Sequence, residues 1–382
     1  MNRLSNMHNA SLQSFAELLN RWPAEIISQK MQTTESRHVL SALKTPRPDP
    51  TTLYQLLSPA AEPYLETLAR QSALTTRQRF GRTMQFYAPL YVSNYCANAC
   101  RYCGFNCRNQ IARSALTREQ AVKEATFLAE QGFRHLLLVA GEDRRHVPVE
   151  YFADLAQQLR TKFASISIEI YPLEQKEYAQ LTAAGVDGLT LYQETYDRNV
   201  YADMHPAGAK KDFDRRLYAI EDGARAGMDK LGIGALLGLS DWRAEAFRTG
   251  LHALYLQKKH WRCQLAVSFP RMRKAAGGFN PPTNVSDKAI VQMLCALRLV
   301  LPDAEMVLST RESQFLRDHI LPLGITRISA ASKTNPGGYT LNNEDSSDQF
   351  EVQDNRSLQE MLKVVRQKGY DPVLKNWDKT LD

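Results

Sequence analysis

From about residue 85 onward, short apolar runs rich in β-branched residues alternate with longer stretches in which apolar residues recur every three to four positions. The short runs predict buried strands and the longer stretches predict amphipathic helices, so the alternation is typical of repeated βα units. Eight strands are predicted, over residues 85–92, 135–140, 165–171, 188–193, 230–237, 264–269, 305–310 and 326–331.

Helices are predicted between these strands, over residues 117–131, 149–163, 173–184, 212–226 and 286–301. The first of them has Thr117 as a suitable N-cap residue and ends before Gly132. Eight strands with crossover helices favour a (β/α)8 barrel of the TIM type, an α/β fold whose chemistry is expected at the carboxyl ends of the strands. An open, doubly wound sheet is the structural alternative.

The two ends of the chain differ from this repeating pattern. Residues 1–80 are polar and helical in character, with a proline-interrupted hinge at residues 45–50, and are predicted to form a helical extension that caps the barrel. The barrel is expected over residues 81–340. Residues 341–382 are expected to form a short C-terminal segment, in which an exposed acidic loop at 342–354 precedes a helix at 357–368.

Composition narrows the class of protein. The 382 residues are 43% hydrophobic and 23% charged, which is typical of a globular protein with a sizeable core. The sequence starts without the apolar core of a signal peptide and has no apolar run approaching the ~18 residues that cross a membrane, so a cytoplasmic protein without membrane contact is expected. The net charge of +7 is not clustered, and nucleic acid is therefore not an expected partner.

Four of the six cysteines lie between Cys96 and Cys107. Cys96, Cys100 and Cys103 form a CxxxCxxC motif directly after the first predicted strand. Three thiolates can hold three irons of a [4Fe–4S] cluster and leave the fourth iron open to a small molecule. A zinc site that adds Cys107 as a fourth thiolate is the alternative, although this spacing is unusual for zinc.

At these residues the sequence resembles the radical S-adenosylmethionine (SAM) superfamily. The resemblance implies a [4Fe–4S] cluster on the three cysteines, SAM as the second cofactor, and Tyr102 as the aromatic residue that shields the cluster near adenine. Gly141-Glu142, after the second strand, resembles the element that holds the SAM ammonium group. Glu142, Glu169 and Glu194 are candidates for the amino and ribose hydroxyl groups of SAM, and a solvent-facing Glu169 is the alternative for that residue.

Further segments narrow the resemblance to the radical SAM aromatic amino acid lyases, and most closely to their tyrosine-cleaving members. These segments are residues 89–96, 308–313 and 329–339. The resemblance implies cleavage of the Cα–Cβ bond of L-tyrosine to 2-iminoacetate (dehydroglycine) and p-cresol, for the thiazole of thiamine. Tyr91 then matches the tyrosine near the substrate amino group.

A free amino acid needs a cation for its carboxylate, which the planar guanidinium of Arg311 could bind in bidentate fashion, with Ser309 adding a hydroxyl. The alternative for Arg311 is a salt bridge to Glu312 or Asp318.

The resemblance also implies partners. Thiazole synthase is expected as a protein partner, because dehydroglycine hydrolyses readily, and a flavodoxin- or ferredoxin-type protein is expected as the electron donor. No cysteine follows Cys295, so the second cluster of the related hydrogenase-maturation lyase is not expected. Two alternative functions stay open: a lyase acting on tryptophan, and a non-catalytic metal-binding protein associated with nucleic acid.

Overall fold

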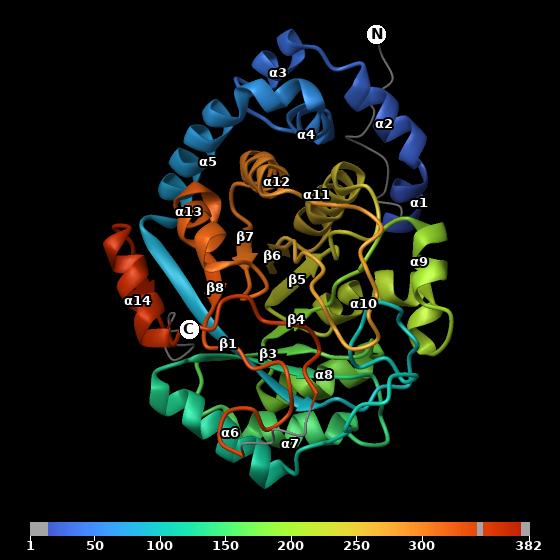
Figure 1. Cartoon of the computed structure of the whole chain (residues 1–382), viewed down its shortest axis with the longest axis vertical. Coiled ribbons are helices and arrows are strands. Elements are labelled where there is room, and N and C mark those ends of the chain that lie inside the picture. Colours follow the sequence, from blue (N-terminus) through green and yellow to red (C-terminus); the bar gives the residue numbers. More distant parts are fainter. Residues whose placement is uncertain (1–13, 342–346, 376–382) are drawn as a thin grey trace.

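Eight parallel strands close into a barrel in the computed structural model, which describes residues 14–341 and 347–375 (Figure 1). Strand β1 pairs with β2 on one side and with β8 on the other, which closes the sheet. The predicted (β/α)8 barrel is therefore confirmed and the open sheet is wrong. The strands are β1 Thr83–Ser93, β2 His135–Ala140, β3 Ser165–Glu169, β4 Gly188–Thr190, β5 Lys230–Gly234, β6 Gln264–Ser268, β7 Glu305–Leu308 and β8 Arg327–Ser329.

Helices surround this barrel and include all five that the apolar periodicity predicts between the strands. The Thr117 side chain accepts a hydrogen bond from the backbone N–H of Gln120, and Gly132 ends the helix with a φ of 111°. The helices are α6 Arg118–Gln131, α7 Val149–Leu159, α8 Gln175–Ala184, α9 Arg198–Met204, α10 Phe213–Arg225, α11 Trp242–Lys259, α12 Asp287–Val300 and α13 Gln314–Gly324. Helix α11 escaped prediction because it is buried on most of its circumference and lacks a broad polar face.

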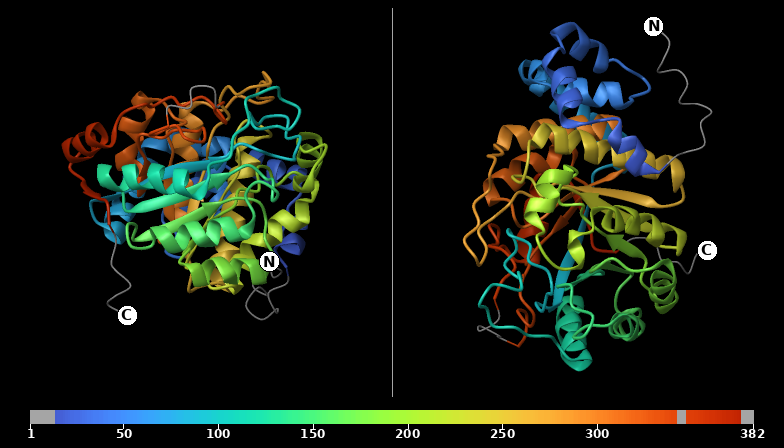
Figure 2. Two further views of the ribbon diagram at one scale, coloured as in Figure 1. Left: turned by 90° about the horizontal axis from the view of Figure 1, so that it is seen from below. Right: turned by 90° about the vertical axis from the view of Figure 1, so that its right-hand side faces the viewer.

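The N-terminal helices lie beside the barrel, against the outer faces of α11, α12 and α13 (Figure 2). The prediction that they cap the barrel is therefore wrong. Helices α11 and α12 are buried on most of their circumference because the extension covers their outer faces, where Trp22 and Tyr54 pack around Phe247 of α11. The extension comprises α1 Phe15–Asn20, α2 Ala24–Gln32, α3 Ser36–Ala42, α4 Pro50–Leu57, the 3₁₀ helix η2 Pro59–Tyr64 and α5 Leu65–Phe80.

The C-terminal segment is part of the barrel's structure. Helix α14 Leu358–Gln367 leads to a short strand, β9 Asp371–Val373, that pairs in parallel with the start of β1. Within residues 347–354 the predicted loop is confirmed, and Asp348 and Glu351 are exposed, but the prediction is wrong for Asp354, which is completely buried and pairs with the equally buried Arg317. Residues 342–346 lie outside the described part of the chain.

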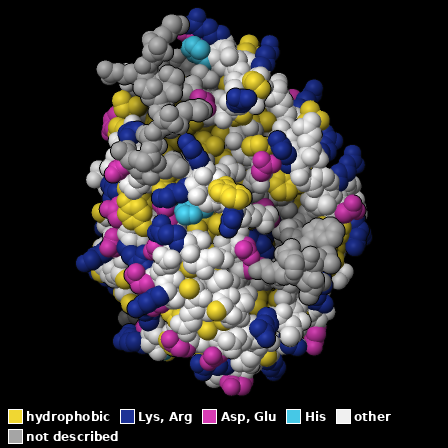
Figure 3. Space-filling view, turned by 180° about the vertical axis from the view of Figure 1, so that it is seen from behind, with side chains coloured by type: hydrophobic (Ala, Val, Ile, Leu, Met, Phe, Trp, Pro, Cys, Tyr) yellow, Lys and Arg dark blue, Asp and Glu magenta, His cyan; other side chains and the backbone are white. Residues whose placement is uncertain are grey.

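Charged side chains of both signs are interspersed on the face of the molecule seen in Figure 3, and the described residues form no single-sign stripe on that face. No helix within the described ranges is both long enough and apolar enough to cross a membrane.

Candidate active site

The three motif cysteines lie on the loop that follows β1, at the carboxyl end of the barrel. Cys100 is buried, Cys96 and Cys103 are half-buried, and Cys107 is exposed. The loop is tied to the chain after β4, because the backbone N–H groups of Ala99 and Arg101 donate to the carbonyls of Ala207 and Met204 at 3.1 Å each. Cys107 thus differs in its exposure from Cys96, Cys100 and Cys103, the three predicted ligands.

Gly141 is the point where the chain after β2 meets this loop. Its N–H donates to the Ser93 carbonyl at 3.0 Å, and a Cβ atom at this position would overlap the carbonyl oxygen of Tyr95 and lie 3.2 Å from Cβ of Cys96. Only glycine lets the two backbones approach this closely. Close packing against the cysteine loop therefore explains why residue 141 is a glycine.

The chemistry of the three thiols fits an iron–sulfur cluster. Asn98 Nδ2 lies 3.8 Å from Cys96 Sγ, and Gln349 Nε2 lies 3.9 Å from Cys103 Sγ, so each sulfur faces an N–H donor. Burial raises the pKa of Cys96 to about 11, and binding of a metal to the sulfur would displace the thiol proton into solvent. Three free thiols on one loop, two of them with an amide donor within 3.9 Å, fit the ligand set of a site-differentiated [4Fe–4S] cluster.

Glu142 and Glu194 are held in a buried charge network beside the cysteines. Arg216 Nη1 lies 3.0 Å from Glu142 Oε1, and Lys210 Nζ lies 2.7 Å from Glu194 Oε1. Asn98 donates to the second Glu142 oxygen at 2.6 Å. Burial alone would raise the pKa of Glu194, but the charges of Lys210 and Arg216 outweigh it and hold that pKa at about 2. Glu194 is therefore ionised, and both carboxylates are fixed in place by cationic partners.

Glu194 also has a φ of 70°, which is uncommon for a residue with a side chain. Such backbone conformations persist where the surrounding structure holds them, often at functional sites. Lys210 and Arg216, which fix this carboxylate, were not among the predicted site residues. No local pattern marks them, because they come from the segment and helix after β4.

Tyr102 is half-buried and is positioned by His205. The Nδ1–H of His205 donates to the Tyr201 carbonyl at 2.7 Å, so its Nε2 is the acceptor for the Tyr102 hydroxyl at 2.8 Å. Burial lowers the pKa of His205 to about 3, so the ring is neutral and this arrangement is maintained at physiological pH. His205 therefore orients the aromatic residue of the cysteine motif.

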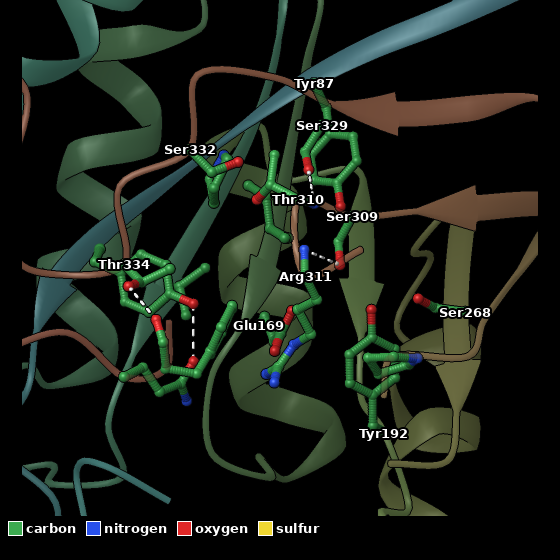
Figure 4. Close-up of a pocket in the computed structure, with 17 residues that line it drawn as sticks. Tyr87, Glu169, Tyr192, Ser268, Ser309, Thr310, Arg311, Ser329, Ser332 and Thr334 are labelled. Atoms are coloured by element: carbon green, nitrogen blue, oxygen red, sulfur yellow. Dashed lines mark hydrogen bonds between the residues drawn. The ribbon is translucent and has the colours of Figure 1, made fainter. Parts of the chain in front are cut away.

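A pocket opens next to this loop (Figure 4). Its lining brings together Tyr91 from β1, Glu169 from the end of β3, and Ser309 and Arg311 from the turn after β7. These four residues were predicted from three separate strand ends. Other lining side chains are Tyr87, Leu137, Val139, Tyr192, Ser268, Ser332, Gln349 and Phe350.

Arg311 has no carboxylate partner in the part of the chain that the structure describes. Its neighbour Glu312 pairs with Arg271 and with Arg273, the latter at 2.7 Å, and Asp318 pairs with Arg356 at 2.9 Å. The salt-bridge alternative for Arg311 is therefore wrong. Its guanidinium lies 3.3 Å from the centre of the Phe350 ring, facing the pocket.

Glu169 lies in the same pocket, where the described residues offer its carboxylate neither a hydrogen bond nor an ion pair. Burial, and secondarily the charge of Glu194, raise its pKa to about 7 against the opposing effect of Arg311. Glu169 is thus turned toward the pocket rather than toward solvent. The pocket presents one cation and one titratable carboxyl group, neither neutralised by a salt bridge within residues 14–341 and 347–375.

Two lining residues, Gln349 and Phe350, were missed because they come from the segment predicted to be an exposed loop. The acidic residues of 342–354 suggest solvent exposure, whereas residues 348–350 return to the mouth of the barrel. Their only sequence signal is the presence of an aromatic residue in an otherwise polar segment.

Comparisons with known proteins agree with this site. Residues 90–249 match the radical SAM superfamily, and residues 268–371 match the biotin and thiamin synthesis associated domain. The chain is 45% identical over 327 residues to 2-iminoacetate synthase of Escherichia coli K12, covering 85% of this chain and 86% of that protein.

Solved structures show the same architecture. The crystal structure of HydG, a maturase of the [FeFe]-hydrogenase, superposes with a TM-score of 0.86 at 31% identity, covering 94% of this chain and 80% of that one. Methylornithine synthase shares the fold, with a TM-score of 0.69 at 22% identity over 87% of this chain and 96% of that one. With a CxxxCxxC loop at the mouth of a closed parallel barrel, this chain belongs to the 2-iminoacetate synthase family of radical SAM enzymes.

Proposed function

We propose that this protein is a carbon–carbon lyase that cleaves the Cα–Cβ bond of L-tyrosine to 2-iminoacetate and p-cresol, with SAM converted to 5′-deoxyadenosine and methionine. The observation that carries the proposal is the pocket beside the cysteine loop, in which Arg311 and Glu169 offer opposite charges and neither has an ion-pair partner among the described residues. An amino acid in its zwitterionic form has complementary charges. When bound, the [4Fe–4S] cluster and SAM supply the electron and the hydrogen-abstracting radical.

Arg311 binds the substrate carboxylate in this proposal. A guanidinium presents two parallel N–H donors that match a carboxylate, and its stacking on Phe350 leaves those donors free. Ser309 lines the pocket within the same turn, and its hydroxyl accepts a hydrogen bond from the backbone N–H of Arg311 at 3.4 Å. The turn after β7 thus provides both groups that orient the carboxylate.

Glu169 and Tyr91 take the opposite end of the zwitterion. The Glu169 carboxyl group, whose pKa is about 7, binds the substrate ammonium, and Tyr91 lies in the pocket beside it. Glu169, which the sequence suggested as a SAM-binding residue, is thus proposed to bind the substrate instead. Holding both charged groups fixes the orientation of the amino acid relative to the reacting centre.

Glu142, Gly141, Glu194 and Tyr102 are proposed to hold SAM. Glu142 and Glu194 are held beside the cysteine loop by Arg216 and Lys210, and each carboxylate can accept further hydrogen bonds beyond those it already receives. Gly141 brings the backbone after β2 against the cysteine loop, and the ring of Tyr102 is fixed by His205. These residues lie on the cluster side of the pocket.

Anaerobic reconstitution with iron, sulfide, SAM, a reductant and L-tyrosine tests the proposed activity. We expect 5′-deoxyadenosine and p-cresol to form in equal amounts, and neither to form without the reductant. A fully loaded chain that releases neither product would exclude the lyase. Indole products from tryptophan, without p-cresol from tyrosine, would assign the other aromatic amino acid.

We propose two protein partners: thiazole synthase, which would receive the easily hydrolysed imine, and a flavodoxin- or ferredoxin-type electron donor. We also propose a cytoplasmic location, since an iron–sulfur cluster and free thiols require a reducing compartment. Anaerobic co-purification tests the first partner, and separate elution of the two proteins would contradict it. Turnover with reduced flavodoxin in place of the chemical reductant tests the second.

A further inference from the structure

We propose that Gln349 is a positioning residue that links the substrate pocket to the cluster ligand Cys103, an inference that rests on the function proposed above. Its side-chain amide contacts both sites at once. The Tyr91 hydroxyl donates to Gln349 Oε1 at 2.8 Å, and Gln349 Nε2 lies 3.9 Å from Cys103 Sγ. One planar group therefore touches a pocket residue and a metal ligand.

The backbone around Gln349 is held independently of this side chain. Its N–H donates to the Thr334 carbonyl at 3.0 Å, and its carbonyl accepts from the N–H of Gly104, the residue after Cys103, at 3.2 Å. The Thr334 hydroxyl donates to Asp348 Oδ1 at 2.7 Å. Because these contacts involve the backbone or neighbouring residues, replacing the Gln349 side chain leaves the segment in place.

Gly104 shows how closely this segment approaches the cysteine loop. A Cβ atom at position 104 would lie 2.5 Å from the carbonyl oxygen of Gln349 and 2.8 Å from that of Asp348. Glycine is needed here because any side chain would push the two backbones apart. The same segment places Phe350 under the guanidinium of Arg311, so it supports the carboxylate clamp and the cluster ligand together.

The orientation of the amide determines its effect on each side. The Tyr91 hydroxyl is the donor to Oε1, so the amide N–H group is the one directed at Cys103. Hydrogen bonds to cluster sulfurs stabilise the added negative charge of the reduced state and raise the reduction potential. Gln349 thereby makes the cluster easier to reduce, and fixes the Tyr91 hydroxyl at the substrate.

Three replacements separate the two contacts. Gln349→Leu removes both of them, whereas Gln349→Glu keeps an acceptor for Tyr91 and removes the N–H donor to sulfur. Tyr91→Phe removes only the hydroxyl. The readout is the midpoint potential of the cluster, from an EPR-monitored redox titration of the cluster-loaded protein without tyrosine, together with its iron content.

We expect a more negative potential in Gln349→Leu and Gln349→Glu, a smaller change in Tyr91→Phe, and full iron content in all three. Turnover of Gln349→Leu should fall about tenfold in kcat, with the KM for SAM within about a factor of two. Gln349→Asn, which keeps the amide, should recover part of the potential. Gln353→Ala is the matched control, because only the backbone N–H of Gln353 makes a hydrogen bond in the described structure.

Gly104→Ala provides a second test through the backbone, since it displaces the whole segment and should shift the potential in the same direction. Wild-type potentials in Gln349→Leu and Gln349→Glu at full iron content would overturn the proposed link. A wild-type protein without lyase activity would refute the proposed function instead, and the potentials would still decide the role of Gln349.

Discussion

The guanidinium of Arg311 stacks on the ring of Phe350 at 3.3 Å, while the neighbouring Glu312 is paired with two other arginines. Arg271 and Arg273 neutralise Glu312, so the carboxylate adjacent to Arg311 does not compete for its N–H groups. An arginine prepared in this way can receive a ligand carboxylate without first breaking a salt bridge.

Arg311→Lys should therefore lose tyrosine binding despite keeping the positive charge. Lysine cannot form two parallel hydrogen bonds, and the loss of about 3 kcal/mol corresponds to on the order of 100-fold in kcat/KM for tyrosine. The rate of product formation at several tyrosine concentrations gives kcat/KM for the variant. The affinity for SAM should be unchanged. Arg37→Lys in the exposed N-terminal extension is the control, and an equal loss there would contradict the assignment.

Phe350→Leu should weaken tyrosine binding less than the Arg311 variant does. The replacement keeps an apolar contact but removes the cation–π interaction, worth about 1 kcal/mol, so the KM for tyrosine should rise about fivefold. Steady-state kinetics under anaerobic conditions measures the change. Phe315→Leu, which changes an exposed phenylalanine at the start of α13, should leave the KM unaltered.

Replacing Cys100 by alanine should abolish cluster binding, whereas Cys107→Ala should retain it. Cys100 is buried within the CxxxCxxC loop, and Cys107 is exposed beyond it. The measurements are iron and sulfide content and the visible absorption after anaerobic reconstitution. A cluster that depends on Cys107 would instead support a four-cysteine site.

Tyrosine binding should weaken as the pH falls through about 7. The pKa of Glu169 is raised to about 7, chiefly by burial, so the carboxyl group loses the negative charge that attracts the substrate ammonium below that pH. Tyrosine affinity measured at several pH values should show this step. Glu169→Gln should bind tyrosine weakly at every pH, and a variant that keeps the wild-type step would exclude Glu169.

Glu169→Gln should also stabilise the protein at high pH. A carboxyl group with a folded pKa above its unfolded value lowers stability as the pH rises from about 4.5 to about 7. Glu169→Gln should therefore raise the free energy of unfolding by on the order of 1–3 kcal/mol at pH 8, with little change at pH 4. Thermal unfolding at the two pH values tests this expectation.

His135→Leu should stabilise the protein in acid. His135 is buried at the start of β2, neither ring nitrogen has a partner among the described residues, and burial lowers its pKa to about 3. Above the unfolded pKa of about 6.5 the imidazole is neutral in both states, so its titration does not lower stability. As the pH falls from about 6.5 toward 3, only the unfolded state takes up the proton, and the folded protein loses stability. At pH 5 the cost is about 2 kcal/mol, which leucine removes.

Thermal unfolding at pH 5 and pH 8 measures this effect, and the gain should appear at pH 5. His319→Leu on the exposed face of α13 is the control. A gain of equal size at both pH values would point to better packing by leucine rather than to titration.

The amino-acid sequence by itself determined the parts of this protein that depend on neighbouring residues. The alternation of apolar patterns located all eight barrel strands, with β2 at the predicted residues, and Thr117 and Gly132 marked the ends of α6. The CxxxCxxC spacing identified the cluster loop because its three ligands lie within eight residues. Periodicity, capping and ligand spacing are local properties, so they can be read along the chain.

Only the tertiary structure decided which charges remain available at the site. Whether Arg311 pairs with Glu312 depends on Arg271 and Arg273, which lie about forty positions earlier in the chain. Lys210 and Gln349 reach the cysteine loop, at Asn98 and Cys103, from segments without a periodic pattern, and closure of the barrel brings them there. Contacts between distant segments depend on how the strand ends converge, which local patterns do not encode.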